Sequence, residues 1–139
     1  MLLFAVLFLI AFWFIGKPAD DTAVFHTLLA DFAEETAVDC GIFTLDDNPK
    51  VAYRCALSAH QIGNGFFVQI QQQGIDSDIA DGWVAMQNGN VLQFNYDSDP
   101  SGGSQTGAVV YQSSCVNPQL TETEIKCSYF NARLRIPIR

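Results

Sequence analysis

The chain opens with an uninterrupted apolar run and then changes to a mixture of apolar and polar positions. Residues 1–15 contain no charged or polar side chain. A membrane-spanning helix needs about 20 residues, and Gly16 with the aliphatic stem of Lys17 can lengthen the run. No basic residue precedes the run, and no clear small-residue cleavage site follows it. We therefore expect residues 1–16 to form an uncleaved membrane anchor helix; a cleaved signal peptide and a buried core helix are the alternatives.

Two helices are expected after the apolar run. Apolar positions recur at three- and four-residue spacing over residues 20–38, which predicts an amphipathic helix. Gly41 is expected to end this helix. A short strand or extended piece over residues 42–45 and a polar turn then lead to a second helix over residues 50–61, with Pro49 at a favourable first helical position.

The second half of the chain has the pattern of strands. Apolar and polar residues alternate over residues 66–72, which predicts a half-buried strand. Further strands are expected over residues 79–87, 91–96 and 107–112, and over 127–130 with 132–138. The tripeptide 88–90, Asn-Gly-Asn, is a strong hairpin signal. The pattern predicts an α+β domain, residues 17–139, with both helices packed on one face of an antiparallel meander sheet of four to five strands.

Composition and charge narrow the classes of function. The 139 residues suffice for one domain. The net charge is −8, with only seven Lys and Arg residues, and the sequence pI is about 4.3. Nucleic-acid binding needs a basic surface that neutralises phosphates, so no nucleic-acid partner is expected. An acidic balance keeps a domain soluble or attracts a basic protein.

Four cysteines, Cys40, Cys55, Cys115 and Cys127, indicate the compartment. An even number in a small domain favours two disulfides in an oxidising environment, and we expect local pairing, Cys40–Cys55 and Cys115–Cys127. Free thiols in a cytosolic protein remain an alternative, whereas no C-x₂₋₄-C pair supports zinc. Lys17 alone favours a cytoplasmic domain, but the cysteines outweigh it. We expect a bacterial inner-membrane protein with a periplasmic domain, or a secreted one if the N-terminal segment is cleaved.

Two acidic tripeptides are the best candidates for a metal or contact loop. Residues 97–102, Asp-Ser-Asp-Pro-Ser-Gly, match the first six positions of a calcium loop, but Ala108 stands where its final glutamate belongs. A tight turn is the alternative explanation. Residues 76–78 form the second tripeptide. The two loops can bring carboxylates together at one end of the sheet, either for a cation or for acid–base chemistry. The side chains concerned are Asp76, Asp78, Asp97, Asp99 and Ser101. We expect no cofactor, and calcium bound by these loops is the alternative.

Other catalytic signatures do not appear in the sequence. There is no Gly-x-Ser-x-Gly elbow, phosphate loop or dinucleotide fingerprint. The two histidines, His26 and His60, each lie alone in an expected helix. These observations favour a protein that is not an enzyme.

Several short motifs follow one another along the domain: Asp39-Cys40-Gly41, Cys55, Gly-Ile-Asp-Ser at 74–77, Tyr-Asp-Ser-Asp-Pro-Ser-Gly-Gly at 96–103, and the last two cysteines. In this order the chain resembles small uncharacterised bacterial envelope proteins and lipoproteins. That resemblance implies an envelope location and no activity. The chain departs from lipoproteins because no acceptor cysteine follows the apolar run.

The general plan of the chain is also similar to that of type IV pilin subunits, although their processing motif and early acidic residue are absent. We expect a non-catalytic, membrane-anchored envelope domain that binds another protein. A pilin-like structural subunit and a hydrolase that uses the acidic loops are the alternatives.

Overall fold

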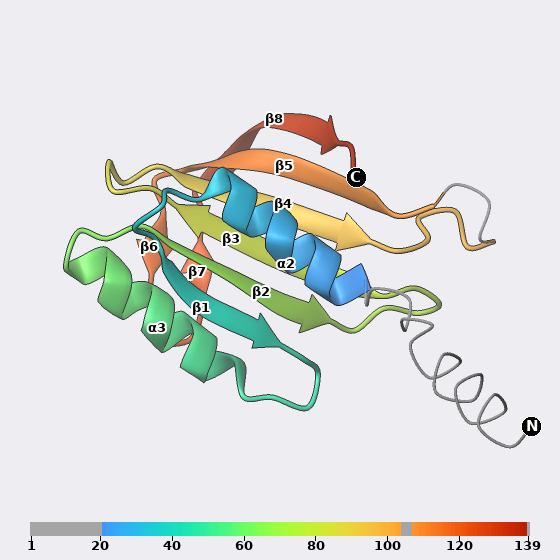
Figure 1. Ribbon diagram of the computed structural model, residues 1–139, viewed down its shortest axis with the longest axis horizontal. Helices are drawn as coiled ribbons and strands as arrows, with labels where there is room; N and C mark the ends of the chain where they lie inside the picture. The colour runs from blue at the N-terminus through green and yellow to red at the C-terminus, as the bar shows by residue number, and fades with distance from the viewer. Residues whose placement is uncertain (1–20, 104–106, 139) are drawn as a thin grey trace, which may run out of the picture.

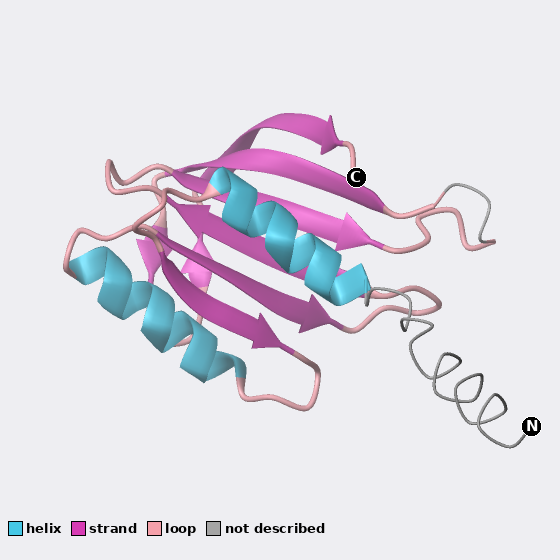
Figure 2. Cartoon of the chain, viewed as in Figure 1, coloured by secondary structure: helices cyan, strands magenta, loops and turns pink. Residues whose placement is uncertain are grey.

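The computed structural model describes residues 21–103 and 107–138, so the expected anchor at residues 1–16 lies outside the described residues. Two helices and eight strands occur in these ranges (Figures 1 and 2). In chain order they are α2 (Asp21–Phe32), β1 (Val38–Phe43), α3 (Pro49–Gln61), β2 (Phe66–Gln72), β3 (Ile79–Ala85), β4 (Val91–Asp97), β5 (Val109–Val116), β6 (Gln119–Leu120), β7 (Ile125–Lys126) and β8 (Tyr129–Ile136). Within the described ranges, no helix has the length and apolarity needed to cross a bilayer.

The main sheet has six strands in the order β1-β2-β3-β4-β5-β8, and β6 and β7 form a separate hairpin. The predicted α+β class is confirmed. The predicted count of four to five strands is wrong, because residues 38–43 form a sixth strand. This strand pairs with β2 in parallel, whereas all other pairs in the sheet are antiparallel. A parallel neighbour needs a crossover connection, and α3 supplies it between β1 and β2.

The two helices cover opposite faces of the sheet, so the prediction that they share one face is wrong. Phe66 and Val68 of β2 pack in one core cluster with the small residues of α3. Phe67 lies in the other cluster, with Phe25 and Leu29 of α2. Because successive strand residues point to opposite faces, β2 is buried on both sides and both sides need a cover.

The first helix is shorter than predicted. It ends at Phe32, where the Ala33 N–H donates to carbonyls of the last turn. Cys40 and Gly41 belong to β1 rather than to the end of a helix. Gly41 has a φ of +91° beside a bulge between Asp39 and Ile42, so its left-handed conformation serves a strand irregularity and not a helix C-cap.

The second helix and the central hairpin agree with the sequence pattern. Asn48 caps α3, because its Oδ1 accepts a hydrogen bond from the Lys50 N–H at 3.1 Å, and Pro49 is the first helical residue. The Asn-Gly-Asn turn joins β3 to β4, and the Met86 N–H donates to the Asn90 carbonyl at 2.9 Å. Later elements depart from the pattern: β5 continues to Val116, and the short β6–β7 hairpin was not expected.

Candidate functional site

Two disulfides hold the domain together, and their predicted pairing is confirmed. Cys40–Cys55 joins β1 to α3 with a Cα–Cα distance of 5.7 Å. Cys115–Cys127 joins β5 to the segment ahead of β8 with a Cα–Cα distance of 5.3 Å. All four cysteines are therefore paired, which is compatible with an oxidising periplasmic or extracellular location.

The two acidic loops lie against each other at one end of the sheet. The Asp78 N–H donates to Ser98 Oγ at 2.9 Å, and the Ser98 N–H donates to the Asp78 carbonyl at 3.0 Å. A hollow of about 360 Å³ has Asp76, Asp97, Asp99 and Ser101 in its lining. Asp78 lines two neighbouring hollows instead. Four of the five candidate side chains thus surround one hollow, as the sequence suggested.

These carboxylates bond to the backbone of their own loop. Asp97 Oδ1 accepts from the Asp99 N–H at 3.0 Å, and Asp99 Oδ2 accepts from the Gly103 N–H at 2.8 Å. Such bonds stabilise tight turns. Among residues 21–103 and 107–138, no group of three or more His, Cys, Asp or Glu side chains is arranged to hold a metal ion.

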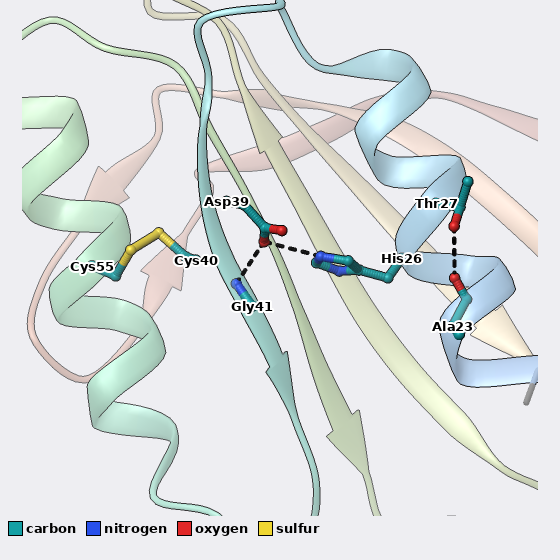
Figure 3. A network of polar contacts seen from close by, with 7 residues as sticks. All are labelled: Ala23, His26, Thr27, Asp39, Cys40, Gly41 and Cys55. Atoms are coloured by element: carbon teal, nitrogen blue, oxygen red, sulfur yellow. Dashed lines mark hydrogen bonds and ion pairs between the residues drawn. A yellow bond between two sulfur atoms is a disulfide. The ribbon is translucent and has the colours of Figure 1, made fainter.

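His26 connects α2 to β1 (Figure 3). Its Nε2 lies 2.9 Å from Asp39 Oδ1, which also accepts from the Gly41 N–H at 2.8 Å. The other ring nitrogen, Nδ1, is buried without a hydrogen-bond partner. His26 therefore joins α2 to β1 through the carboxylate of Asp39. Cys40, which follows Asp39 in β1, points to the other face of the sheet, where it forms the disulfide with Cys55. Side chains of β1 therefore join this strand to both helices.

A second polar pair lies on the α3 side of the sheet. Asn95 Nδ2 donates to Asp81 Oδ1 at 2.7 Å. Burial raises the pKa of Asp81, and the hydrogen bond from Asn95 partly opposes this shift. Burial also raises the pKa of Tyr53, with a contribution from the negative charge of Asp81. Sequence reasoning missed this pair, although the alternation in residues 79–87 places Asp81 on the face of Trp83.

An apolar groove with a volume of about 640 Å³ lies between α2 and the end of β8. Its apolar lining consists of Val24, Leu28, Phe32, Ile136, Pro137 and Ile138. In Figure 1, α2 crosses the middle of the sheet while β8 lies at its margin. The groove therefore follows the side of α2 that faces the free margin of the sheet.

Strand β8 borders this groove and forms an open edge of the sheet. It pairs with β5 on one side, and no described strand pairs with its other side. Seven of its eight residues are exposed, including Tyr129, Phe130 and Leu134. We call β8 together with the lining of the groove the α2–β8 surface. Sequence reasoning did not identify it.

The α2–β8 surface also carries basic side chains on an otherwise acidic protein. The Arg133 guanidinium lies 4.2 Å from the centroid of the Tyr111 ring, a cation–π contact. Neither Arg133 nor Arg135 forms an ion pair with any carboxylate of the described residues. By contrast, Arg54 on α3 pairs with Glu122 at 3.1 Å.

Comparison of the chain with protein-family models, with curated proteins and with solved structures finds no match in any of the three. The resemblance to small envelope proteins therefore stays a prediction.

Proposed function

We propose that this protein is a non-catalytic, membrane-anchored envelope domain that binds another protein through the α2–β8 surface. The observation that carries the proposal is the open edge at β8, where apolar side chains are exposed beside an apolar groove. The two disulfides support an extracytoplasmic location, and the apolar residues 1–16 support an anchor.

A partner that covers the α2–β8 surface would remove exposed apolar side chains from water. Leu134 keeps 54% of its surface exposed, and Phe130 keeps 47%. Burial of such apolar side chains is favourable, at about 25 cal/mol per Å² removed from water. An exposed strand edge also has unpaired N–H and C=O groups, which domains commonly cover or blunt. A protein partner can satisfy both needs at once, since it offers apolar side chains and backbone hydrogen bonds.

The test compares two variants of matched chemistry. Leu134→Glu places a charge on the α2–β8 surface, whereas Val51→Glu does the same at a position on α3 that is 55% exposed. Tagged full-length protein would be used to capture partners from envelope extracts, with bound proteins identified by mass spectrometry. We expect a partner that wild type and Val51→Glu retain and Leu134→Glu loses. Equal capture by all three proteins, or no capture by any, would contradict the proposal.

A further inference from the structure

We infer that the partner binds by adding a β-strand to β8, and that this strand alternates acidic and apolar side chains. The inference rests on the proposed function and specifies the chemistry of the partner. It combines three features: the free backbone of β8, the division of its side chains between the two faces, and the charge of the rest of the domain.

The backbone of β8 is prepared for pairing along its outer side. Its inner side pairs with β5 in antiparallel register, with Gln112 opposite Leu134 and Val110 opposite Ile136, and the register shifts between Leu134 and Asn131. An edge of this kind is a template for an incoming strand, whose main chain supplies hydrogen bonds while alternate side chains supply specificity. Both edge strands contain a register shift, between Asp39 and Ile42 in β1 and between Asn131 and Leu134 in β8. They differ because a disulfide joins β1 to α3, whereas β8 pairs regularly with β5 from Leu134 to Ile136, so this part of β8 is where a strand can be added.

The side chains of β8 differ between the two faces of the sheet. Ile136 packs with Val110 in the cluster beneath α2, so Ile136 and Leu134 face the groove. Arg135 lies opposite Tyr111 in the register, and Arg133 covers the Tyr111 ring. Both arginines therefore face the other way. Directly opposite cross-strand neighbours interact most strongly, so the best partner presents apolar residues on the groove side and carboxylates on the arginine side.

Charge argues for a different protein rather than a second copy. The chain has a net charge of −8, yet Arg133 and Arg135 lack carboxylate partners among the described residues. Antiparallel pairing of β8 with its own copy, centred on any of residues 133 to 135, sets arginine opposite arginine. Like charges at opposed positions destabilise a sheet, whereas an acidic strand neutralises them.

Synthetic peptides test this inference on the full-length chain in detergent. The first probe alternates valine and glutamate, and the second has the same composition with the glutamates gathered at one end. A third probe alternates valine and lysine. Two further versions of the first probe carry N-methyl groups on one or the other set of alternate amides, so that each removes the hydrogen bonds along one side of the strand. Fluorescence anisotropy measures the affinity of each peptide.

We expect the alternating acidic peptide to bind at least about tenfold more tightly than the gathered version. One N-methylated version should lose at least about tenfold in affinity and the other should change little, since only one side of an added strand faces β8. The double variant Arg133→Glu/Arg135→Glu should prefer the lysine peptide. The control Lys50→Glu/Lys126→Glu changes the net charge equally but should keep the wild-type preference.

Other outcomes would overturn the inference, and they separate it from the proposed function. Equal binding of the alternating and gathered peptides, or equal effects of the two N-methylated versions, rules out strand addition. A dimer in sedimentation that excludes the peptides means that a second copy occupies β8. If no peptide binds while Leu134→Glu still abolishes capture from extracts, the α2–β8 surface binds a protein in another way. If Leu134→Glu captures as wild type does, the proposed function itself fails.

Discussion

Replacing Gln69 with methionine should stabilise the protein. Gln69 lies in β2 and is completely buried, and neither its Nε2 nor its Oε1 has a hydrogen-bond partner. Burial of an amide without hydrogen bonds is unfavourable, because the amide gives up its bonds to water and gains none. Methionine has a similar length and shape without the polar atoms. The change Gln69→Met therefore removes a cost while it preserves the packing.

The size of the effect follows from the two unpaired atoms. Each unsatisfied buried group costs about 1–3 kcal/mol, so we expect a gain of at least about 2 kcal/mol in the free energy of unfolding. Glutamine and methionine lose similar amounts of side-chain entropy on burial, so that contribution cancels. For a domain of this size, the gain corresponds to an increase of about 6–10 °C in the unfolding midpoint.

Urea denaturation followed by circular dichroism, with both disulfides intact, measures this gain. Gln71→Met is the control, because Gln71 lies on the same strand and face but is only half-buried. Its amide reaches solvent, so its replacement should change the free energy of unfolding by less than about 0.5 kcal/mol. If Gln69→Met unfolds at lower urea than wild type, the amide of Gln69 is satisfied, for example by a buried water, and the reasoning is refuted.

Three other substitutions test the packing of α2 on β3, the disulfide Cys40–Cys55 and the buried carboxyl group of Asp81. A Cβ on Gly82 would lie 2.5 Å from Leu29 Cδ2, so Gly82→Ala should destabilise the domain by about 1–3 kcal/mol in urea unfolding; an unchanged midpoint would mean that α2 is not held close to β3. The double variant Cys40→Ser/Cys55→Ser should lose about 3 kcal/mol in the same assay, because the bridge closes a loop with a sequence separation of 15; a loss below about 1 kcal/mol would contradict that loop-closure argument. The raised pKa of Asp81 means that ionisation of its carboxyl group is disfavoured in the folded state. Wild-type stability should therefore fall as the pH rises from 3.8, the ordinary pKa of an aspartate, through the raised pKa of Asp81. The variant Asp81→Asn should lack this fall and be the more stable protein at neutral pH; parallel stability curves between about pH 4 and pH 7 would mean that folding does not shift the pKa of Asp81, which contradicts the prediction.

The sequence pattern predicted the strand at residues 66–72 but not that both of its faces are buried. Alternation normally places polar residues in solvent, so the half-buried strand predicted over residues 66–72 implies an exposed Gln69, whereas its exposed fraction is 0%. Only the position of α2 above it reveals the burial. Likewise, nothing local to residues 38–43 indicates a parallel strand, because its partner β2 comes after a complete helix. Contacts of this kind depend on the whole fold.

The disulfide pairing could be predicted because short separations along the chain favour local bridges, and both are confirmed. The hollow between the acidic loops followed from their positions at the same ends of neighbouring strands. The α2–β8 surface could not be predicted. The sequence places Arg133 and Arg135 on either side of Leu134, but this alternation gains meaning only once β8 is known to end the sheet.

The contrast between the two margins of the sheet limits what the protein can build. At one margin, the disulfide Cys40–Cys55 joins β1 to α3, while at the other margin no described strand pairs with the outer side of β8. A fibre that grows by strand addition requires two open sheet edges on every subunit, so that each subunit pairs with one neighbour on either side. A molecule with a single open edge can pair with one partner, and no further subunit can then be added. We therefore expect complexes of fixed, one-to-one stoichiometry rather than polymers, whichever protein binds the outer side of β8.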